Sequence, residues 1–548
     1  SSRNFASRFA GAVKKGLKGV DNVYTQHQPL LATTLEAAAR GKLPEAAYPS
    51  VAVGGAGGAG GESGRAPRVC VAGGGFGGLY AALRLGQLAW PDGSRPEITL
   101  VDRNSRFLFK PLLYELLNGG AEEAEVAPKF ADLLRGSGAS FVRGELLSVG
   151  GVPSPSAWRG AGERGRVSVL PPGDGAIPLD LPYDYLLLSL GAEPAALDVP
   201  GVREHAVPFS TLEDAREVQA RLEALEGLRR PVKVMLVGGG ESGVELAVTV
   251  AERLRGRGTV LLVCSADDIL VGSPRPHRDA AWKQLSDLGV DVLLGSRVEG
   301  VREAIAGLDE DLRPGRRYRV AVSGETLREE RGADLLLWTA GQRAATSSAE
   351  TGHPLAPFCP CGPDGRILVE PSLCVQGLER VFAMGDAVAV EGASRGDAPM
   401  TAQVAMQQAE FAAWNVWSSI NGQPPVPFRY QHLGNMMGFG RDRGAVTLPL
   451  GEGLTLDGEV GGFVRKVAYL YRMPTNEQRL KIVSNLARKV GAAARAPLLV
   501  LRPGAHDGDG HQAGAFGQGG DHAGERYDHA RLRAGRVAHA RVGEGTNA

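Results

Sequence analysis

The sequence predicts an α/β protein with two Rossmann-like units and a C-terminal amphipathic segment. Two glycine-rich stretches, VCVAGGGFGGLYAA at 69–82 and VMLVGGGESGVELA at 234–247, each join an apolar run to a helical pattern. Further apolar strands alternate with helical patterns, which is typical of mainly parallel sheets. A basic stretch at 462–495, with an apolar helical stripe, has a different character from both units.

Composition narrows the class of protein. A chain of 548 residues suggests two to four domains. The 61 basic residues equal the 61 acidic ones, so net charge gives no argument for a nucleic-acid partner. The five cysteines lack CxxC spacing, so neither a metal site nor a disulfide framework is expected. No apolar run is long enough to span a membrane, so any membrane contact should be peripheral.

Both ends of the chain are expected to lie outside the folded part. The first twenty residues are basic, contain Ser and Ala and lack acids, which resembles an organelle transit peptide. A disordered basic tail is the alternative. A glycine-rich linker at 54–64 completes the predicted leader, 1–65. Residues 501–548 have no apolar periodicity and are predicted to be disordered.

Between these ends we expect four folded segments. The first nucleotide-binding domain begins at 66–212 and resumes at 346–440, and the second domain, 213–345, is inserted between the two parts. The first part contains the strands EITLVD and YDYLLLSLGAEP, the insert closes with ADLLLWTAGQ, and the last part holds RVFAMGDAV and a long helix from Thr401 to Ile420. The fourth segment, 441–500, is expected to associate with a membrane.

The first glycine turn carries a dinucleotide-binding fingerprint. Gly73, Gly75 and Gly78 stand in G-x-G-x-x-G spacing directly after a strand. The first glycine permits the tight turn, the second lets backbone N–H groups approach a pyrophosphate, and the third lets the helix pack on the strand. Asp102 ends the next strand, where a carboxylate can bind ribose hydroxyls.

The second turn repeats the spacing with Gly238, Gly240 and Gly243. Here Cys264 and Ser265 stand where the ribose-binding acid is expected. A carboxylate would repel a 2′-phosphate whereas small polar groups tolerate one, so this pattern favours NADPH, or both nicotinamide cofactors, over NADH alone.

Four charged residues near this strand leave the preference open. Asp267 and Asp268 are acids that a shift of the loop could bring to the ribose. Arg275 and Arg278 are candidate phosphate partners, or ordinary surface arginines. Two fingerprints in one chain indicate a resident flavin and a visiting nicotinamide, with hydride passing between them.

Several motifs together resemble one family. The motifs are RVCVAGGGFGGLYAALRL, FKPLLYELLNG, GGGESGVELA, LLLWTAG, RVFAMGDA, TAQVAMQQAEFAAWNVW and VAYLYRMPT. They resemble the type II NAD(P)H:quinone oxidoreductases, within the glutathione-reductase-like flavoproteins, and are most similar to the plastid C-type branch. The resemblance covers about 67–490. It implies FAD as cofactor and NADPH or NADH as cosubstrate.

The resemblance also implies roles for individual residues. Gly73, Gly75, Gly78 and Asp102 would contact FAD. Lys110, Pro111 and Leu112 would lie near the isoalloxazine, and Asp386 would contact the ribityl or pyrophosphate region. Glu245 would face the flavin and the nicotinamide, orienting the carboxamide or relaying a proton. Gln403 and Gln407 share a helix face and would line the quinone pocket.

The basic segment at 462–495 is predicted to be an interfacial helix. Leu480, Val483, Leu486 and Val490 form one stripe. The basic residues around it are Arg465, Lys466, Arg472, Arg479, Lys481, Arg488, Lys489 and Arg495. The expected partners are a prenylquinone and a membrane surface or lipid-droplet monolayer, with a homodimer possible.

The resemblance implies two-electron reduction of a prenylquinone such as demethylphylloquinone or plastoquinone by NADPH or NADH through FAD. A plastid location is expected, with the mitochondrion as alternative. Two other functions stay open: a flavoenzyme with another acceptor, such as a ferredoxin reductase, and a redox sensor that binds both dinucleotides but turns over poorly.

Overall fold

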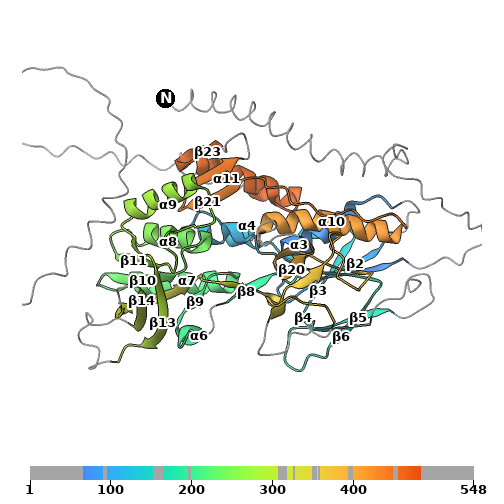
Figure 1. Ribbon diagram of the computed structural model, residues 1–548, viewed down its shortest axis with the longest axis horizontal. Coiled ribbons are helices and arrows are strands. Elements are labelled where there is room, and N and C mark those ends of the chain that lie inside the picture. The colour runs from blue at the N-terminus through green and yellow to red at the C-terminus, as the bar shows by residue number, and fades with distance from the viewer. Residues whose placement is uncertain are drawn as a thin grey trace, which may run out of the picture. The chain divides into compact units, whose positions relative to one another are not determined.

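The computed structural model describes residues 66–90, 95–151, 164–195, 199–305, 317–324, 328–347, 355, 358–392, 399–448 and 454–482. The predicted leader and linker at 1–65 and the predicted tail at 501–548 lie outside these residues. The description below concerns the described part of residues 1–488, which forms one compact unit (Figure 1).

The first sheet contains five parallel strands in the order β19-β7-β1-β2-β3. Their bounds are Arg68–Ala72 for β1, Glu97–Asp102 for β2, Ala139–Arg143 for β3, Tyr185–Leu188 for β7 and Val381–Ala383 for β19. The edge strand β19 follows β7 only after the whole second sheet has been formed. The second unit is therefore an insertion in the chain of the first.

Helices α3, Phe76–Gln87, and α10, Ala402–Ile420, pack against each other beside this sheet (Figure 1). The indole N–H of Trp417 donates to Ala89 O, and Arg84 forms an ion pair with Glu410 at 2.9 Å. These contacts join the two sequence-distant parts of the first unit.

The second sheet is also parallel, in the order β12-β11-β10-β16-β9. The bounds are Val207–Pro208 for β9, Val232–Val237 for β10, Gly258–Val263 for β11, Asp291–Leu293 for β12 and Leu335–Trp338 for β16. Its long helices are α7, Leu212–Glu226, α8, Glu241–Arg253, and α9, Arg275–Asp287. Because β9 already belongs to this sheet, the insertion begins before the predicted boundary at 212/213.

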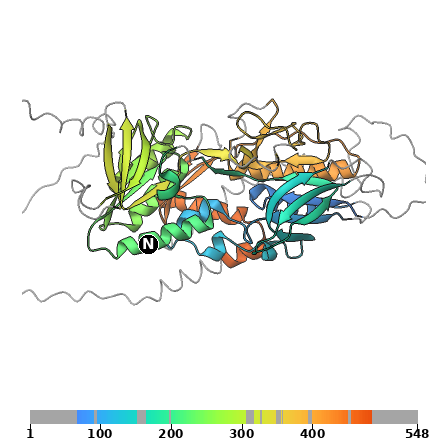
Figure 2. The ribbon, with the colours of Figure 1, turned by 90° about the horizontal axis from the view of Figure 1, so that it is seen from below.

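Smaller sheets flank the two large parallel ones (Figure 2). One is formed by β4, Glu145–Gly150, β5, Gly165–Leu170, and β6, Leu179–Tyr183, and another by β13, Ser296–Glu303, β14, Tyr318–Gly324, and β15, Arg328–Ala333. The pairs are β8, Ala192–Pro194, with β17, Gln342–Ala344, and β18, Ile367–Val369, with β20, Val388–Val390. The β8–β17 pair lies where the chain enters and leaves the second unit.

Short helices complete these units. They are η2, Lys110–Leu116, α4, Glu123–Val126, α5, Phe130–Leu133, α6, Val202–His205, η4, Ala345–Ser347, and η5, Gly385–Ala387. Helix η2 contains the predicted flavin residues Lys110, Pro111 and Leu112, and η5 contains Asp386.

The C-terminal part folds as a small sheet under a helix. Strands β21, Asn435–Phe439, β22, Arg443–Leu448, and β23, Leu454–Leu456, precede α11, Gly458–Arg472. Helix α11 lies directly on β22: a Cβ on Gly462 would come within 2.2 Å of Asp442 O, so only glycine allows this approach. The predicted boundary at 440/441 falls inside the β21–β22 hairpin, so hydrogen bonding places 435–440 with the C-terminal part.

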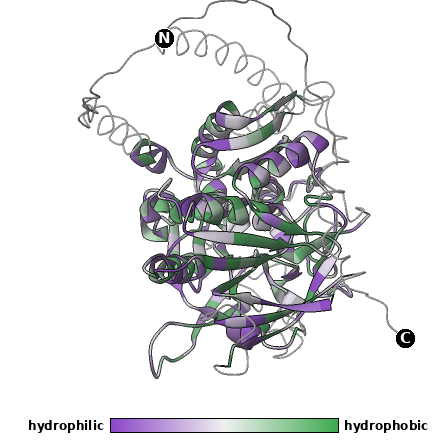
Figure 3. Cartoon of the chain, turned by 90° about the vertical axis from the view of Figure 1, so that its left-hand side faces the viewer, coloured by the Kyte–Doolittle hydropathy of each residue, from purple (hydrophilic) through white to green (hydrophobic). Residues whose placement is uncertain are grey.

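The central strands of both parallel sheets are buried, as their uninterrupted apolar sequences require. All four residues of β7 and all four of β16 are buried. Figure 3 shows apolar residues along the strands and mixed character on the helices. Within the described residues, no helix combines the length and hydropathy needed to cross a bilayer.

Candidate functional site

The first glycine turn has the shape that a dinucleotide requires. Gly73 has φ of +98°, and a Cβ there would come within 2.2 Å of Ser189 O. A Cβ on Gly78 would come within 1.8 Å of Gly73 O, so helix and strand meet in contact. A Cβ on Gly75 would meet nothing within 4 Å, which leaves space for a phosphate at the start of α3.

Asp102 lies beside this turn. Its Oδ2 accepts the N–H of Gly74 at 2.6 Å and its Oδ1 accepts the N–H of Asn104 at 2.7 Å. Burial raises the pKa of the carboxyl, and these two N–H groups act in the opposite direction. The carboxylate is thus held at the end of β2, where a ribose would lie.

The second turn repeats this geometry. Gly238 has φ of +120°, with Thr339 Oγ1 only 2.6 Å from the position of a Cβ, and a Cβ on Gly243 would come within 1.8 Å of Gly238 O. A Cβ on Gly240 would again meet nothing within 4 Å. In both turns the first and third glycines meet neighbouring protein atoms closely and the middle glycine faces open space, so both fit a bound pyrophosphate. Ser265 is exposed in the loop after β11, and Arg278 forms an ion pair with Asp268 at 3.4 Å.

Helix η2 brings the FKPLL motif to the region between the two turns. Lys110 is its first residue, Pro111 starts the helix without needing an N–H partner, and Leu112 is buried. The Lys110 side chain keeps access to solvent, yet surrounding protein lowers the pKa of its ammonium. The charges of Asp386 and Asp214 act in the opposite direction. Lys110 therefore lies near acids from two other segments.

Asp386 lies in η5, directly after strand β19. Burial raises the pKa of its carboxyl, and the charge of Lys110 lowers it. The preceding Gly385 has φ of +82°, and its N–H donates to Gln408 Oε1 at 2.7 Å. The structure thus brings Lys110 and Asp386, two predicted flavin residues that are distant in sequence, into electrostatic contact.

Glu245 lies on α8, on the side facing η2 and β21. Its Oε1 accepts the N–H of Gly438 at 2.6 Å. Burial raises the pKa of this carboxyl to about 8, although the Gly438 N–H and the Arg465 charge act to lower it. Burial raises the pKa of the Tyr114 hydroxyl in η2, and the nearby Glu245 charge raises it further. Glu245 therefore holds a proton at neutral pH in the region between the two units.

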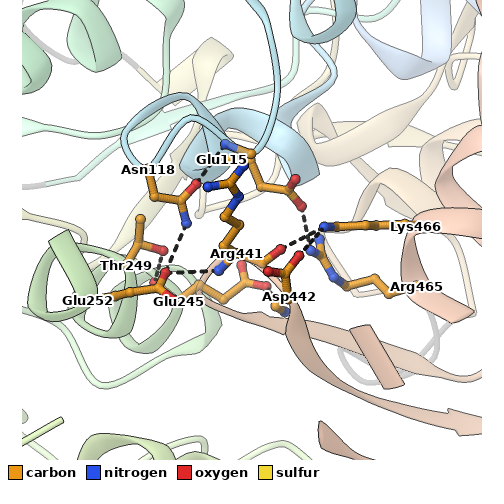
Figure 4. A network of polar contacts seen from close by, with 11 residues as sticks. Glu115, Asn118, Glu245, Thr249, Glu252, Arg441, Asp442, Arg465 and Lys466 are labelled. Carbon is orange, nitrogen blue, oxygen red and sulfur yellow. Dashed lines mark hydrogen bonds and ion pairs between the residues drawn. The ribbon is translucent and has the colours of Figure 1, made fainter. Parts of the chain in front are cut away.

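Arg465 corrects one sequence prediction. It was expected among the basic residues of a membrane-facing segment, yet it is 1% exposed and forms an ion pair with Glu115 of η2 (Figure 4). Its guanidinium lies 5.2 Å from the Tyr469 ring centroid. Since α11 packs on the body of the protein through this face, Arg465 is a core residue. Lys466 stays partly exposed and donates to Arg441 O at 2.7 Å.

A second carboxylate of α8 binds the same hairpin. Glu252 lies seven residues after Glu245, on the same helix face. Its Oε2 accepts the N–H of Arg441 at 2.9 Å and the side-chain amide of Asn118 at 3.2 Å (Figure 4). Helix α8 is therefore joined both to the segment after η2 and to the β21–β22 turn.

The predicted quinone residues lie on α10, and their amides are bound to the loop before β21. Gln403 Oε1 accepts from the Tyr430 hydroxyl at 2.5 Å and the Leu433 N–H at 3.0 Å. Gln407 exchanges two hydrogen bonds with the Gln431 backbone at 2.8 and 3.0 Å. Among the described residues they fasten this loop to the helix, and their role toward a quinone stays a prediction.

Four functional candidates were missed: Glu115, Glu252, Gln408 and the inward-facing role of Arg465. Gln408 is 1% exposed, and it lines a cavity of about 440 Å³ together with Gly385, Met400 and Val404. The sequence does hold one indication for Gln408: it lies four residues after the apolar Val404, and residues at that spacing share a helix face. Glu115 and Arg465 are 350 residues apart. No local pattern relates them.

Comparison with known proteins agrees with this architecture. The family model of the pyridine nucleotide-disulphide oxidoreductases matches residues 67–409. The chain is 40% identical to the Arabidopsis thaliana alternative NAD(P)H-ubiquinone oxidoreductase C1, chloroplastic/mitochondrial, over 76% of this chain and 79% of that protein. It is 36% identical to the demethylphylloquinone reductase NdbB of Synechocystis, over 78% of this chain and 97% of that protein.

Solved structures show the same fold. NDH2 from Plasmodium falciparum, in complex with NADH, superposes with a TM-score of 0.59 at 16% identity, covering 76% of this chain and 96% of that chain. The sulfide:quinone oxidoreductase of Aquifex aeolicus gives a TM-score of 0.57 at 18% identity, over 74% of this chain and 90% of that chain.

Proposed function

The chain belongs to the type II NAD(P)H:quinone oxidoreductases, within the pyridine nucleotide-disulphide oxidoreductases, and from this premise we propose that it reduces a membrane prenylquinone with NADPH or NADH through bound FAD. The observation that carries the proposal is that helix η2 holds Lys110 near Asp386 of the first unit and Tyr114 near Glu245 of the second. The first turn would bind FAD and the second the nicotinamide cosubstrate. Bound FAD would supply hydride transfer between the two substrates.

The residues of the first unit have defined tasks in this scheme. Asp102 would bind ribose hydroxyls of FAD, and the start of α3 would face its pyrophosphate. Asp386 would accept from hydroxyls of the ribityl chain. Lys110, with Pro111 and Leu112 fixing its position in η2, would place a positive charge beside the ring system, where negative charge develops on reduction.

Glu245 is suited to proton transfer. Reducing a quinone to a quinol consumes two protons, so the site needs a group that is protonated at working pH and lies out of bulk water. Burial raises the Glu245 pKa to about 8, which meets this requirement near neutrality. The Gly438 N–H fixes the carboxyl, so β21 positions the proton donor. Gln403 and Gln407 of α10 would hydrogen-bond the quinone carbonyls. Their amides would then give up their present hydrogen bonds to residues 430–434.

We further propose that α11 presents the membrane-facing surface. Its exposed face carries Val460, Phe463, Val467 and Tyr471, which are 36%, 48%, 40% and 64% exposed and follow a helical spacing. An apolar helix face of this kind suits the interface of a membrane or a lipid-droplet monolayer. Of the stripe expected from sequence, Leu480 is 70% exposed, while Val483, Leu486 and Val490 lie outside the described residues.

The compartment and the quinone follow from relatives. The Arabidopsis relative is named as chloroplastic/mitochondrial and the Synechocystis relative as a demethylphylloquinone reductase. The first name supports a plastid or mitochondrial location, of which we propose the plastid, and the second supports demethylphylloquinone as the acceptor. Plastoquinone is a further proposed acceptor. A homodimer stays a prediction.

One experiment tests the function as a whole. The purified protein should show a flavin absorption spectrum that NADPH or NADH bleaches and a prenylquinone analogue restores. Absence of flavin, or flavin that neither nicotinamide reduces, would refute the proposal. Full bleaching with reoxidation by ferredoxin but by no quinone would place the protein among ferredoxin reductases instead.

A further inference from the structure

The two glycine turns allow a comparison within one molecule. The strands β1–β2 and β10–β11 pair in the same register relative to their turns: Ala72 lies opposite Val101, and Val237 lies opposite Val263. The next residues, Asp102 and Cys264, are therefore equivalent positions.

The side chains confirm this equivalence. A Cβ on Gly74 would lie 3.1 Å from Asp102 Oδ2, and a Cβ on Gly239, the matching glycine, would lie 2.2 Å from Cys264 Sγ. The thiol thus occupies the place that the ribose-binding carboxylate occupies in the first unit. Burial raises the pKa of the Cys264 thiol, so the group is neutral.

The two acids that follow differ in their surroundings. Asp268 Oδ1 accepts the indole N–H of Trp282 at 2.9 Å and the N–H of Ile269 at 2.8 Å, so its carboxylate is bound toward α9. Asp267 is exposed in the same loop, and beside the effect of burial its charge and that of Asp268 raise the pKa of the Cys264 thiol. Exposed Ser265 is left next to the strand end. The strand end itself therefore carries Cys264 and Ser265 in place of a carboxylate.

Arg278 can supply positive charge nearby. Within the described residues only its Nη1 has an acceptor, Asp268 Oδ2 at the long distance of 3.4 Å, and its Nε has none. Asp268 divides its carboxylate between Arg278, Trp282 and the backbone. The guanidinium therefore retains donors, and a planar guanidinium suits a phosphate.

We propose that the second unit is specific for the 2′-phosphate of NADPH, with Cys264 and Ser265 taking the place of the ribose-binding carboxylate at the strand end and Arg278 binding the phosphate. This inference rests on the proposed function, because it names the cosubstrate of the same site. The determinant of cosubstrate preference would be the uncharged strand end, because a carboxylate at the Cys264 or Ser265 position would select NADH.

Binding of two small probes to the FAD-loaded enzyme tests this inference apart from turnover. Isothermal titration with 2′,5′-ADP and with 5′-AMP compares ligands that differ only in the 2′-phosphate. We expect 2′,5′-ADP to bind about tenfold tighter or more, and the advantage to shrink with added salt. Equal affinities would overturn the specificity alone. Binding of neither probe would also count against the nicotinamide site itself.

Variants test the residues. Ser265→Glu, at an exposed position, and Cys264→Asp should each reduce or reverse the preference for 2′,5′-ADP, and Arg278→Gln should reduce it. Cys361→Asp is a matched control, because it introduces the same charge at an exposed thiol in another segment, and should leave both affinities unchanged. If neither Ser265→Glu nor Arg278→Gln changes the ratio, the assignment is wrong.

Discussion

At the scale of single residues, the carboxyl of Glu245 combines burial with a fixed orientation. The Gly438 N–H holds one oxygen, and burial raises the pKa to about 8. Two acids on the same helix face have different roles, since Glu252 caps the Arg441 N–H whereas Glu245 keeps a proton.

Replacing Glu245 by glutamine should slow the reoxidation of reduced flavin by quinone by about 10²–10⁴-fold, the usual contribution of a general acid. The wild-type rate should fall as pH rises through about 8, where the carboxyl loses its proton, and the variant should lack this fall. Stopped-flow absorbance measures both half-reactions. Glu252→Gln is the control on the same helix face, and a variant with an unchanged reoxidation rate would refute the proton role.

The same carboxyl predicts a pH dependence of stability. Its pKa rises from 4.5 to about 8 on folding, so the folded state binds more protons between these values. The free energy of unfolding should therefore fall as pH rises from 4.5 to 8. Denaturant titrations across this range should show a smaller fall for Glu245→Gln than for the wild type. Parallel curves for the two proteins would contradict the shifted pKa.

The ion pair between Arg465 and Glu115 is nearly excluded from water, with side chains 2% and 6% exposed. Arg465→Met leaves the Glu115 charge buried without this partner, so we expect a loss of about 3–5 kcal/mol in the free energy of unfolding. The double variant Arg465→Met with Glu115→Leu should recover much of that loss. If Arg465→Met alone were as stable as the wild type, the Glu115 carboxylate would be reached by water and the expected cost would be wrong.

At the scale of elements, α11 has two faces with different partners. One face carries Arg465 and Tyr469 into the core, and Gly462 lets the helix lie on the β22 backbone. The opposite face carries the exposed apolar side chains, including Phe463 and Val467. The helix therefore connects the outer surface to the neighbourhood of Glu245.

Introducing charge on that outer face should weaken membrane binding. The double variant Phe463→Glu and Val467→Glu should lose most of its flotation with liposomes, because two charges would enter the apolar interface. Activity with a water-soluble short-chain quinone should be retained. Ile177→Glu, at a residue that is 82% exposed in another segment, is the control. Unchanged flotation of the double variant would exclude α11 as the lipid-facing helix.

At the scale of the whole molecule, two similar turns carry out different tasks because of their surroundings. Gly75 and Gly240 both face space free of protein atoms within 4 Å of a Cβ. Asp102 stands beside the first turn and Cys264 beside the second. Helix α8 of the inserted unit contacts η2 of the first and β21 of the C-terminal part, so the site is assembled from three segments.

The division of tasks predicts opposite defects in a matched pair of variants. Gly75→Val should reduce the flavin content of the purified protein, because the side chain enters the phosphate space of the first turn. Gly240→Val should retain flavin and bind 5′-AMP and 2′,5′-ADP more weakly. Flavin absorbance and titration calorimetry measure the two effects. Loss of flavin in Gly240→Val with retention in Gly75→Val would reverse the assignment.

The sequence by itself determined the two parallel sheets, the glycine turns and the place of Asp102. These depend on contiguous stretches, in which apolar runs and glycine spacing encode the local backbone directly. It did not determine the direction of Arg465 or the boundary at 440/441, because a charge and a turn look the same in sequence whether they face water or protein.

Only the tertiary structure decided which acids are bound by other parts of the protein and which are exposed. Asp267 and Asp268 carry the same charge, yet Trp282 and Arg278 bind Asp268, whereas Asp267 is exposed. Glu245 acquires a raised pKa only because η2, β21 and α11 bury it together. Desolvation and hydrogen bonding depend on every neighbour in space, and those neighbours come from segments hundreds of residues apart.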